Sequence, residues 1–165
     1  MTVEAPTPKC RCDDLSRVRV VDFAADEEDG ELAMPKLQRV VRADPDRWWL
    51  TCRRCPVCDR HWLVAQEERI NDVYIVRELQ PAEVTAIVES GRWPSDFDSY
   101  EALLRWGREA GHSARFVDTR CETLQRTARD LILQRPNIET QDISELLNVS
   151  MDDATWLRQA SKNLS

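Results

Sequence analysis

Apolar residues recur with a period of two in the first half of the chain and with a period near 3.6 in the second half. In the first half, β-branched and aromatic residues form short runs between charged or turn-forming residues, which is typical of strands. The predicted strands cover residues 18–23, 36–41, 48–52, 61–65 and 73–78. We expect these five runs to form an antiparallel sheet.

Helical spacing begins after the last predicted strand. Pro81 suits the first turn of a helix, and Gly91 is expected to end that helix. A second helix is predicted after residues 98–101, which read as a capping box, and Gly111 is expected to end it. These two helices are predicted to cover one side of the sheet.

The last third predicts three more helices, at about 119–134, 141–147 and 151–162. Ile143, Leu146 and Leu147 would form the inner face of the middle helix, and Ser150 is placed to cap the last one. Residues 142–150 resemble the second helix and turn of a helix-turn-helix. The predicted fold class is α+β: a zinc-pinned, zinc-ribbon-like antiparallel β-sheet with covering helices (residues 1–114), followed by a three-helix unit (residues 115–165).

Five of the six cysteines fall into two short clusters, at positions 10–12 and 52–58. Cys55 and Cys58 flank a two-residue spacer that folds both sulfurs into one pocket, as in a zinc knuckle. Cys10 and Cys12 would point to the same side of an extended segment. Zn²⁺ in structural sites is bound tetrahedrally by four such thiolates. The sequence therefore predicts a structural zinc held by Cys10, Cys12, Cys55 and Cys58.

Other uses of these residues stay open at this point. Cys52 could replace Cys58 as a ligand, and His61 is a further substitute. The run C-x2-C-x2-C also begins a bacterial iron–sulfur pattern, although the expected x3-C-P does not follow it. Disulfides would require an oxidising compartment, and residues 1–9 lack the apolar core of a signal peptide.

No motif in the sequence predicts an enzyme. The chain has no Gly-rich phosphate loop, no nucleophile elbow, no H-E-x-x-H, and only two histidines. Cys121 stands alone within a predicted helix, and a zinc held by four thiolates leaves no open position for water. We therefore expect a protein without catalytic residues.

Charge and hydropathy limit the choice of partner. The chain carries 30 acidic against 23 basic residues, a formal charge of −7, which argues against general affinity for phosphate backbones. It has no apolar run of about 20 residues, so we expect no membrane span and a cytoplasmic location. Residues 36–62 reverse the charge balance and interleave arginines with Trp48, Trp49 and Trp62. Single-stranded nucleic acid is the alternative partner there, but burial of one of the adjacent tryptophans is the favoured interpretation.

A protein partner is the favoured expectation. Residues 26–30 are predicted to form a solvated hairpin loop, and this loop could also attract a basic partner. Trp156 lies off the predicted inner face of the last helix and is a second candidate contact. The partner-binding residues predicted from the sequence are Asp26, Glu27, Glu28, Asp29 and Trp156.

One family resemblance follows from the cysteine segment. Residues 49–52 run into Cys55-Pro-Val-Cys58-Asp-Arg-His-Trp, then Glu67 or Glu68 and a strand through Tyr74. This segment, about 45–80, resembles the zinc ribbon of small bacterial immunity proteins encoded beside polymorphic toxins, with Asp59 where glycine is usual. The resemblance implies a cytoplasmic inhibitor that occupies the active face of a basic, nuclease-type toxin.

The alternative function is a zinc-ribbon/helix-turn-helix DNA-binding transcriptional regulator. The shape of the last three helices favours it. The charge opposes it, because Asp152 and Asp153 occupy the first turn of the helix that would enter the major groove.

Overall fold

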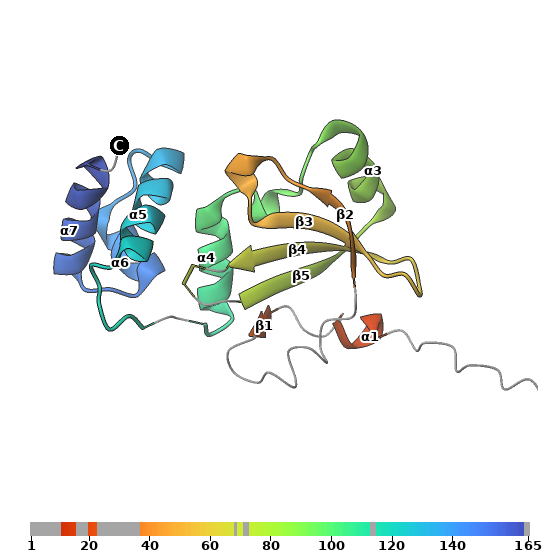
Figure 1. Cartoon of the computed structure of the whole chain (residues 1–165), viewed down its shortest axis with the longest axis horizontal. Helices are drawn as coiled ribbons and strands as arrows, with labels where there is room; N and C mark the ends of the chain where they lie inside the picture. The colour runs from red at the N-terminus through yellow and green to blue at the C-terminus, as the bar shows by residue number, and fades with distance from the viewer. Residues whose placement is uncertain are drawn as a thin grey trace, which may run out of the picture.

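The computed structural model describes residues 11–15, 20–22, 37–67, 69–70, 73–112 and 115–163. Within these ranges the chain forms an antiparallel sheet followed by helices, so the predicted α+β class is confirmed. Figure 1 shows the sheet at one end of the molecule and helices α5, α6 and α7 at the other, with α4 between them. The elements are α1 (Cys12–Leu15), β1 (Val20–Asp22), β2 (Gln38–Arg42), η1 (Pro45–Arg47), β3 (Leu50–Arg54), β4 (His61–Glu67), β5 (Val73–Leu79), α3 (Pro81–Ser90), η2 (Ser95–Phe97), α4 (Tyr100–Glu109), α5 (Glu122–Gln134), α6 (Thr140–Leu147), α7 (Met151–Ala160) and η3 (Ser161–Asn163).

The strand order is β1-β5-β4-β3-β2, and every described pair is antiparallel. Strands β2 to β5 form a meander, while β1 pairs with β5 and so lies at the opposite edge from β2. The described strands that precede and follow the predicted 26–30 hairpin loop, β1 and β2, are not paired with each other. Residues 26–29 themselves lie outside the described ranges.

The two faces of the sheet are covered by different parts of the chain. One face packs against α3, η2 and α4, as predicted, and its core includes Leu50, Cys52, Leu63, Ala65, Ile75, Ile87, Phe97, Leu103 and Leu104. The other face carries Trp62, Val64 and Val76, which pack with Cys12 and Leu15 of α1. The central strand β4 is consequently buried on both sides.

The helix caps differ in one place from the prediction. Residues 98–101 do not form a capping box: Ser99 is the N-cap of α4, and its hydroxyl accepts a hydrogen bond from the backbone N–H of Ala102 at 3.1 Å. The N-cap is one residue later than predicted because Asp98 is the C-cap of the preceding helix η2. The carboxylate that reaches back to a cap belongs instead to Glu83, which accepts from the N–H of Gln80 at 2.9 Å.

The C-terminal helices form a bundle whose core is continuous with the sheet. Ile143, Leu146 and Leu147 of α6 are buried, as predicted, in the same cluster as the sheet residues that contact α4. Helix α5 begins at Glu122, later than predicted, so Cys121 is its N-cap and not an internal residue. Ser150 caps α7 through the N–H of Asp153 at 3.1 Å, which confirms that prediction.

The turn between α6 and α7 depends on Asn148, whose φ of 51° lies in the left-handed region. Residues with a Cβ pay about 1–2 kcal/mol there, and asparagine is one of the side chains that tolerate it best. Asn148→Ala is expected to lower the free energy of unfolding by about 1 kcal/mol, and Asn148→Gly to stay within about 0.5 kcal/mol of the parent. Chemical denaturation measures both values. Equal losses in the two variants would show that the backbone conformation is not what Asn148 contributes.

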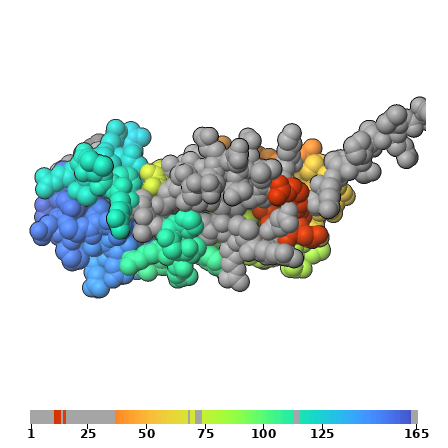
Figure 2. All heavy atoms as spheres, turned by 90° about the horizontal axis from the view of Figure 1, so that it is seen from below, coloured from red at the N-terminus to blue at the C-terminus, as the bar shows by residue number. Residues whose placement is uncertain are grey.

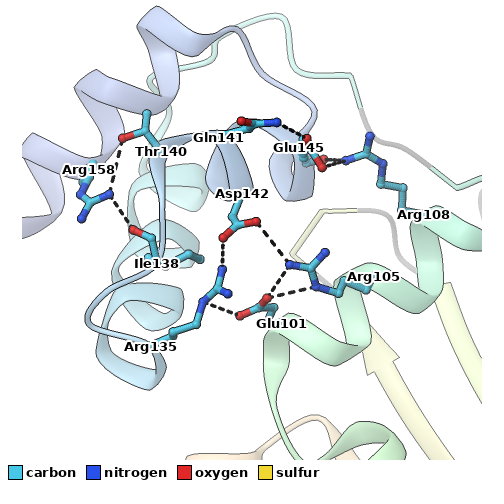
Figure 3. Close-up of polar contacts among 10 residues, drawn as sticks. All are labelled: Glu101, Arg105, Arg108, Arg135, Ile138, Thr140, Gln141, Asp142, Glu145 and Arg158. Carbon is cyan, nitrogen blue, oxygen red and sulfur yellow. Dashed lines mark hydrogen bonds and ion pairs between the residues drawn. The ribbon is translucent and has the colours of Figure 1, made fainter.

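A network of charged side chains joins α4 to the helical bundle (Figure 3). Glu101 of α4 contacts Arg105 at 2.7 Å and Arg135 at 3.2 Å, and Arg135 in turn pairs with Asp142 of α6. Arg108 donates a hydrogen bond to the backbone carbonyl of Glu145. Because several charges share partners, these contacts fix the orientation of α6 against α4 better than isolated surface pairs would.

This network predicts a specific loss of stability in acid. Burial alone would raise the pKa of Asp142, but the charge and hydrogen bond of Arg135 outweigh it and lower the pKa below its ordinary 3.8. The stabilisation is therefore present above about pH 4 and is lost as the pH falls through the lowered value. Asp142→Asn is expected to cost about 1 kcal/mol near pH 7 and much less near pH 2.5. Urea unfolding at the two pH values measures this, and an equal difference at both would contradict the assignment.

Candidate metal centre

Three cysteines from two distant parts of the sequence meet on the face of the sheet that α1 covers. The sulfurs of Cys12, Cys55 and Cys58 all lie within 4.8 Å of one another. Cys12 begins α1, whereas Cys55 and Cys58 belong to the turn between β3 and β4. In Figure 2 the red spheres of α1 lie beside this turn, at the opposite end of the molecule from α7.

The turn holds its two sulfurs through the backbone. The N–H of Cys55 donates to the carbonyl of Arg60 at 2.9 Å, and the N–H of Asp59 donates to the carbonyl of Cys55 at 3.0 Å. Asp59 has a φ of 60°, a left-handed conformation that aspartate tolerates better than most residues with a Cβ. These bonds close the segment into a knuckle that presents both thiols on one side.

Apolar packing holds α1, and with it Cys12, against the sheet more than charge does. Leu15 is 1% exposed and shares a cluster with Trp62 and Val76 of the sheet. Asp13 also pairs with Arg60 of the knuckle at 2.6 Å, although Asp13 is largely exposed and such a pair contributes little. Cys12 was predicted to lie in an extended segment. It begins a helical turn instead, and Leu15 at the end of the same turn packs onto the sheet.

The surroundings favour the thiolate form of Cys55. Burial alone would raise the pKa of its thiol, but hydrogen bonds from the backbone N–H groups of Cys58 and Val57, together with the thiols of Cys12 and Cys58, lower it to about 7. Cys52 shows the reverse, because burial raises its pKa to about 11. The thiolate is the form that binds metals, so Cys55 is prepared for a ligand role that Cys52 is not.

The donor set fits a metal of the zinc type. Tetrahedral coordination with zinc–sulfur bonds of about 2.3 Å places sulfurs roughly 3.8 Å apart, a spacing compatible with this group. Cys10, the predicted fourth ligand, lies outside the described residues. The structure places Cys52 in the core between the sheet and α4, and neither Cys52 nor His61 belongs to the cysteine group among the residues described.

The remaining predicted contact residue is Trp156. It is half-buried on α7, packs against the bundle core, and lies under the guanidinium of Arg120 at 5.1 Å. One face of its ring is thus already engaged within the chain.

Trp49 is buried and Trp48 half-buried, which confirms that only one of the two adjacent tryptophans is fully enclosed.

A buried carboxylate was not recognised from the sequence. Glu67, at the end of β4, is 1% exposed and accepts hydrogen bonds from the N–H groups of Arg69 and Ile70, both at 3.0 Å. It also accepts from the hydroxyl of Tyr100, whose pKa is raised by burial and by the charge of Glu67. Arg69 continues the connection to Asp130 of α5. Glu67 therefore ties the β4–β5 turn to the helices, a role that no local motif could have indicated.

Comparisons with known proteins give no relative. No family model matches the chain, and no curated protein or solved structure is significantly similar to it. In the described part of the chain, every helix is too short or too polar to cross a membrane. The fold and the site define an α+β protein with a three-cysteine group compatible with metal binding.

Proposed function

We propose that this chain is a zinc protein in which the metal is structural and the function is binding of a protein partner. The observation that carries the proposal is the convergence of Cys12, Cys55 and Cys58, from segments 43 positions apart in the sequence, 12 to 55. Cys10, two positions before Cys12, completes a four-thiolate set. The metal supplies a cross-link between the amino-terminal segment and the sheet.

The burial of two of the three cysteines supports a structural role over a catalytic one. Cys12 and Cys55 are 0% and 2% exposed, and they pack among Leu15, Trp62 and Val64. Catalytic zinc requires an open coordination position that substrate and water can reach. A metal with four thiolate ligands has no such position, so in this proposal the cysteines hold the chain together and do not activate water.

A chelation experiment tests the structural role. Addition of a strong chelator is expected to abolish hydrogen-exchange protection of the α1 backbone and of the Cys55–Arg60 turn. The α5–α7 bundle, which lies at the other end of the molecule from α1 (Figure 1), is expected to retain most of its protection. Unchanged exchange in the knuckle after complete metal removal would contradict the proposal.

The proposed partner is a protein, and the immunity-like resemblance makes it a bacterial toxin with a basic face. Support comes from the charge of −7 and from the exposed side of α7, where Met151 and Asp152 are accessible. The test is to co-express the chain with the product of the neighbouring open reading frame. We expect a stable complex that suppresses toxicity. A toxic neighbour that neither binds nor is inhibited would contradict the cytoplasmic immunity role.

A second candidate function rests on the α6–α7 geometry. An eight-residue helix, a turn with left-handed Asn148, and a ten-residue helix match a helix-turn-helix. Asp152 and Asp153 occupy the first turn of α7, however, where they would face DNA phosphates. We expect no gel shift with random duplex DNA at low ionic strength. A salt-dependent shift would favour the transcriptional regulator.

A further inference from the structure

The sheet carries a second site, a pocket whose lining is basic and contains no cysteine. A pocket of about 150 Å³ lies against β2 and β3, which are neighbours in Figure 1. Its lining includes Arg39, Arg42, Thr51, Arg53, Gln66 and Trp48. No carboxylate contributes to this lining within the described part of the chain. The pocket therefore combines three guanidinium groups with a hydroxyl, an amide and an indole.

A β-bulge brings the arginines together. In regular β2 pairing, Arg39 and Arg42 would point to opposite faces, because side chains alternate. The register shifts between Arg39 and Val41, so Arg39 lies opposite Arg53 while Arg42 lies opposite Thr51. The extra residue, Val40, restores both arginines to one face of the sheet. Bulges change the direction in which side chains point, and this one places Arg39 and Arg42 on the same face of the sheet as Arg53.

Within the described part of the chain, no carboxylate pairs with these three arginines. Nine other arginines of the described chain form ion pairs with carboxylates. Arg39, Arg42 and Arg53 form none with the described residues, and Arg53 donates only to the hydroxyl of Thr51 at 3.2 Å. Burial, and then the charge of Arg39, lower the pKa of the Arg53 guanidinium. Like charges directly opposite across strands destabilise a sheet unless an anion lies between them.

We propose that this pocket binds an oxyanion, namely a phosphate group that is either free or the terminal group of a small monoester. Guanidinium forks match phosphate oxygens in geometry, and the side-chain amide of Gln66 can donate a further hydrogen bond. The volume is about half of the ~300 Å³ at which ligand pockets begin, so it suits a single anionic group with the rest of the ligand outside. The half-buried indole of Trp48 forms the adjacent wall.

The test is calorimetric titration of the full chain with inorganic phosphate at constant ionic strength. We expect saturable binding at one site per chain. The double variant Arg39→Ala and Arg42→Ala is expected to weaken binding at least about tenfold, since each hydrogen bond between charged groups contributes about 1.5–3 kcal/mol. Arg126→Ala is the matched control: this exposed arginine pairs with Glu122 on α5 and is expected to leave phosphate affinity unchanged.

Further titrations distinguish free phosphate from a phosphate monoester as the ligand. Glycerol phosphate that binds as well as or better than inorganic phosphate would support the monoester, and weaker binding would support the free ion. A third titration uses octathymidylate that lacks a terminal phosphate. If the chain binds this oligonucleotide but neither small ligand, and the slope of log K against log salt concentration corresponds to several phosphate contacts, the proposal is overturned in favour of a nucleic-acid strand. Absence of phosphate binding, or equal affinity in the double variant, would also overturn it.

Folding of the variants is controlled separately. The double variant removes two exposed charges, one of which, Arg39, lies opposite Arg53, so its unfolding temperature in phosphate-free buffer is expected to equal or exceed that of the parent. If it is destabilised, the single variant Arg42→Ala, which faces Thr51 and no arginine, provides the same comparison. The metal proposal involves none of these residues and stands or fails independently.

Discussion

Replacing Cys55 with serine is expected to remove the bound metal and to lower the free energy of unfolding by at least about 3 kcal/mol. Structural zinc contributes on the order of 10 kcal/mol of apparent folding free energy, so its loss is expected to exceed this threshold. Cys55 is 2% exposed and lies in the cysteine group together with Cys12 and Cys58. Among the described residues, this group contains no other side chain that could take the place of Cys55 as a metal ligand. Metal analysis and chemical denaturation measure the two effects.

Two other cysteines serve as matched controls. Cys121→Ser changes the N-cap of α5, where serine is a favourable residue, so we expect full metal content and equal or slightly higher stability. Cys52→Ser places a hydroxyl in the core and is expected to cost about 1–3 kcal/mol with full metal content. Loss of the metal in Cys52→Ser, with retention in Cys55→Ser, would show that the ligands have been misassigned.

Glu67→Ala is expected to lower the free energy of unfolding by about 3–5 kcal/mol without changing the metal content. The substitution leaves the hydroxyl of Tyr100 and the N–H groups of Arg69 and Ile70 without their acceptor, and each unsatisfied buried donor costs about 1–3 kcal/mol. Denaturation with urea measures the loss.

The control for this variant is Glu109→Ala, at the exposed end of α4. An acidic residue in the last turn opposes the helix dipole, so its removal is expected to change stability by less than about 0.5 kcal/mol. A double-mutant cycle with Tyr100→Phe should give a coupling of about 1–3 kcal/mol. A loss below about 1 kcal/mol in Glu67→Ala would contradict a structural role for this carboxylate.

The strands and helices were predictable from the sequence where local rules decide them. The apolar period located all five strands, and Ser150 with the buried face of α6 located the turn before α7. The pairing of β1 was not predictable, because three residues carry no register information and the partner, β5, is some fifty positions later.

The site was partly predictable. Cysteine spacing indicated Cys55 and Cys58, because the knuckle is a local structure that Pro56 and Asp59 favour. The Cys-x-Cys spacing also indicated Cys12, but the helical turn that holds it depends on Leu15 packing with Trp62 of the sheet, which no local pattern encodes. The same holds for Glu67 and Tyr100, which are 33 positions apart. The arginine pocket requires the bulge at Val40, and alternation alone places Arg39 and Arg42 on opposite faces.

X-ray absorption spectroscopy on protein purified under reducing, chelator-free conditions tests the central claim most directly. The account predicts one zinc per chain, coordinated by four sulfurs at about 2.3 Å. A cooperatively folded protein that contains no metal, or a bound ion without sulfur ligands, would contradict it.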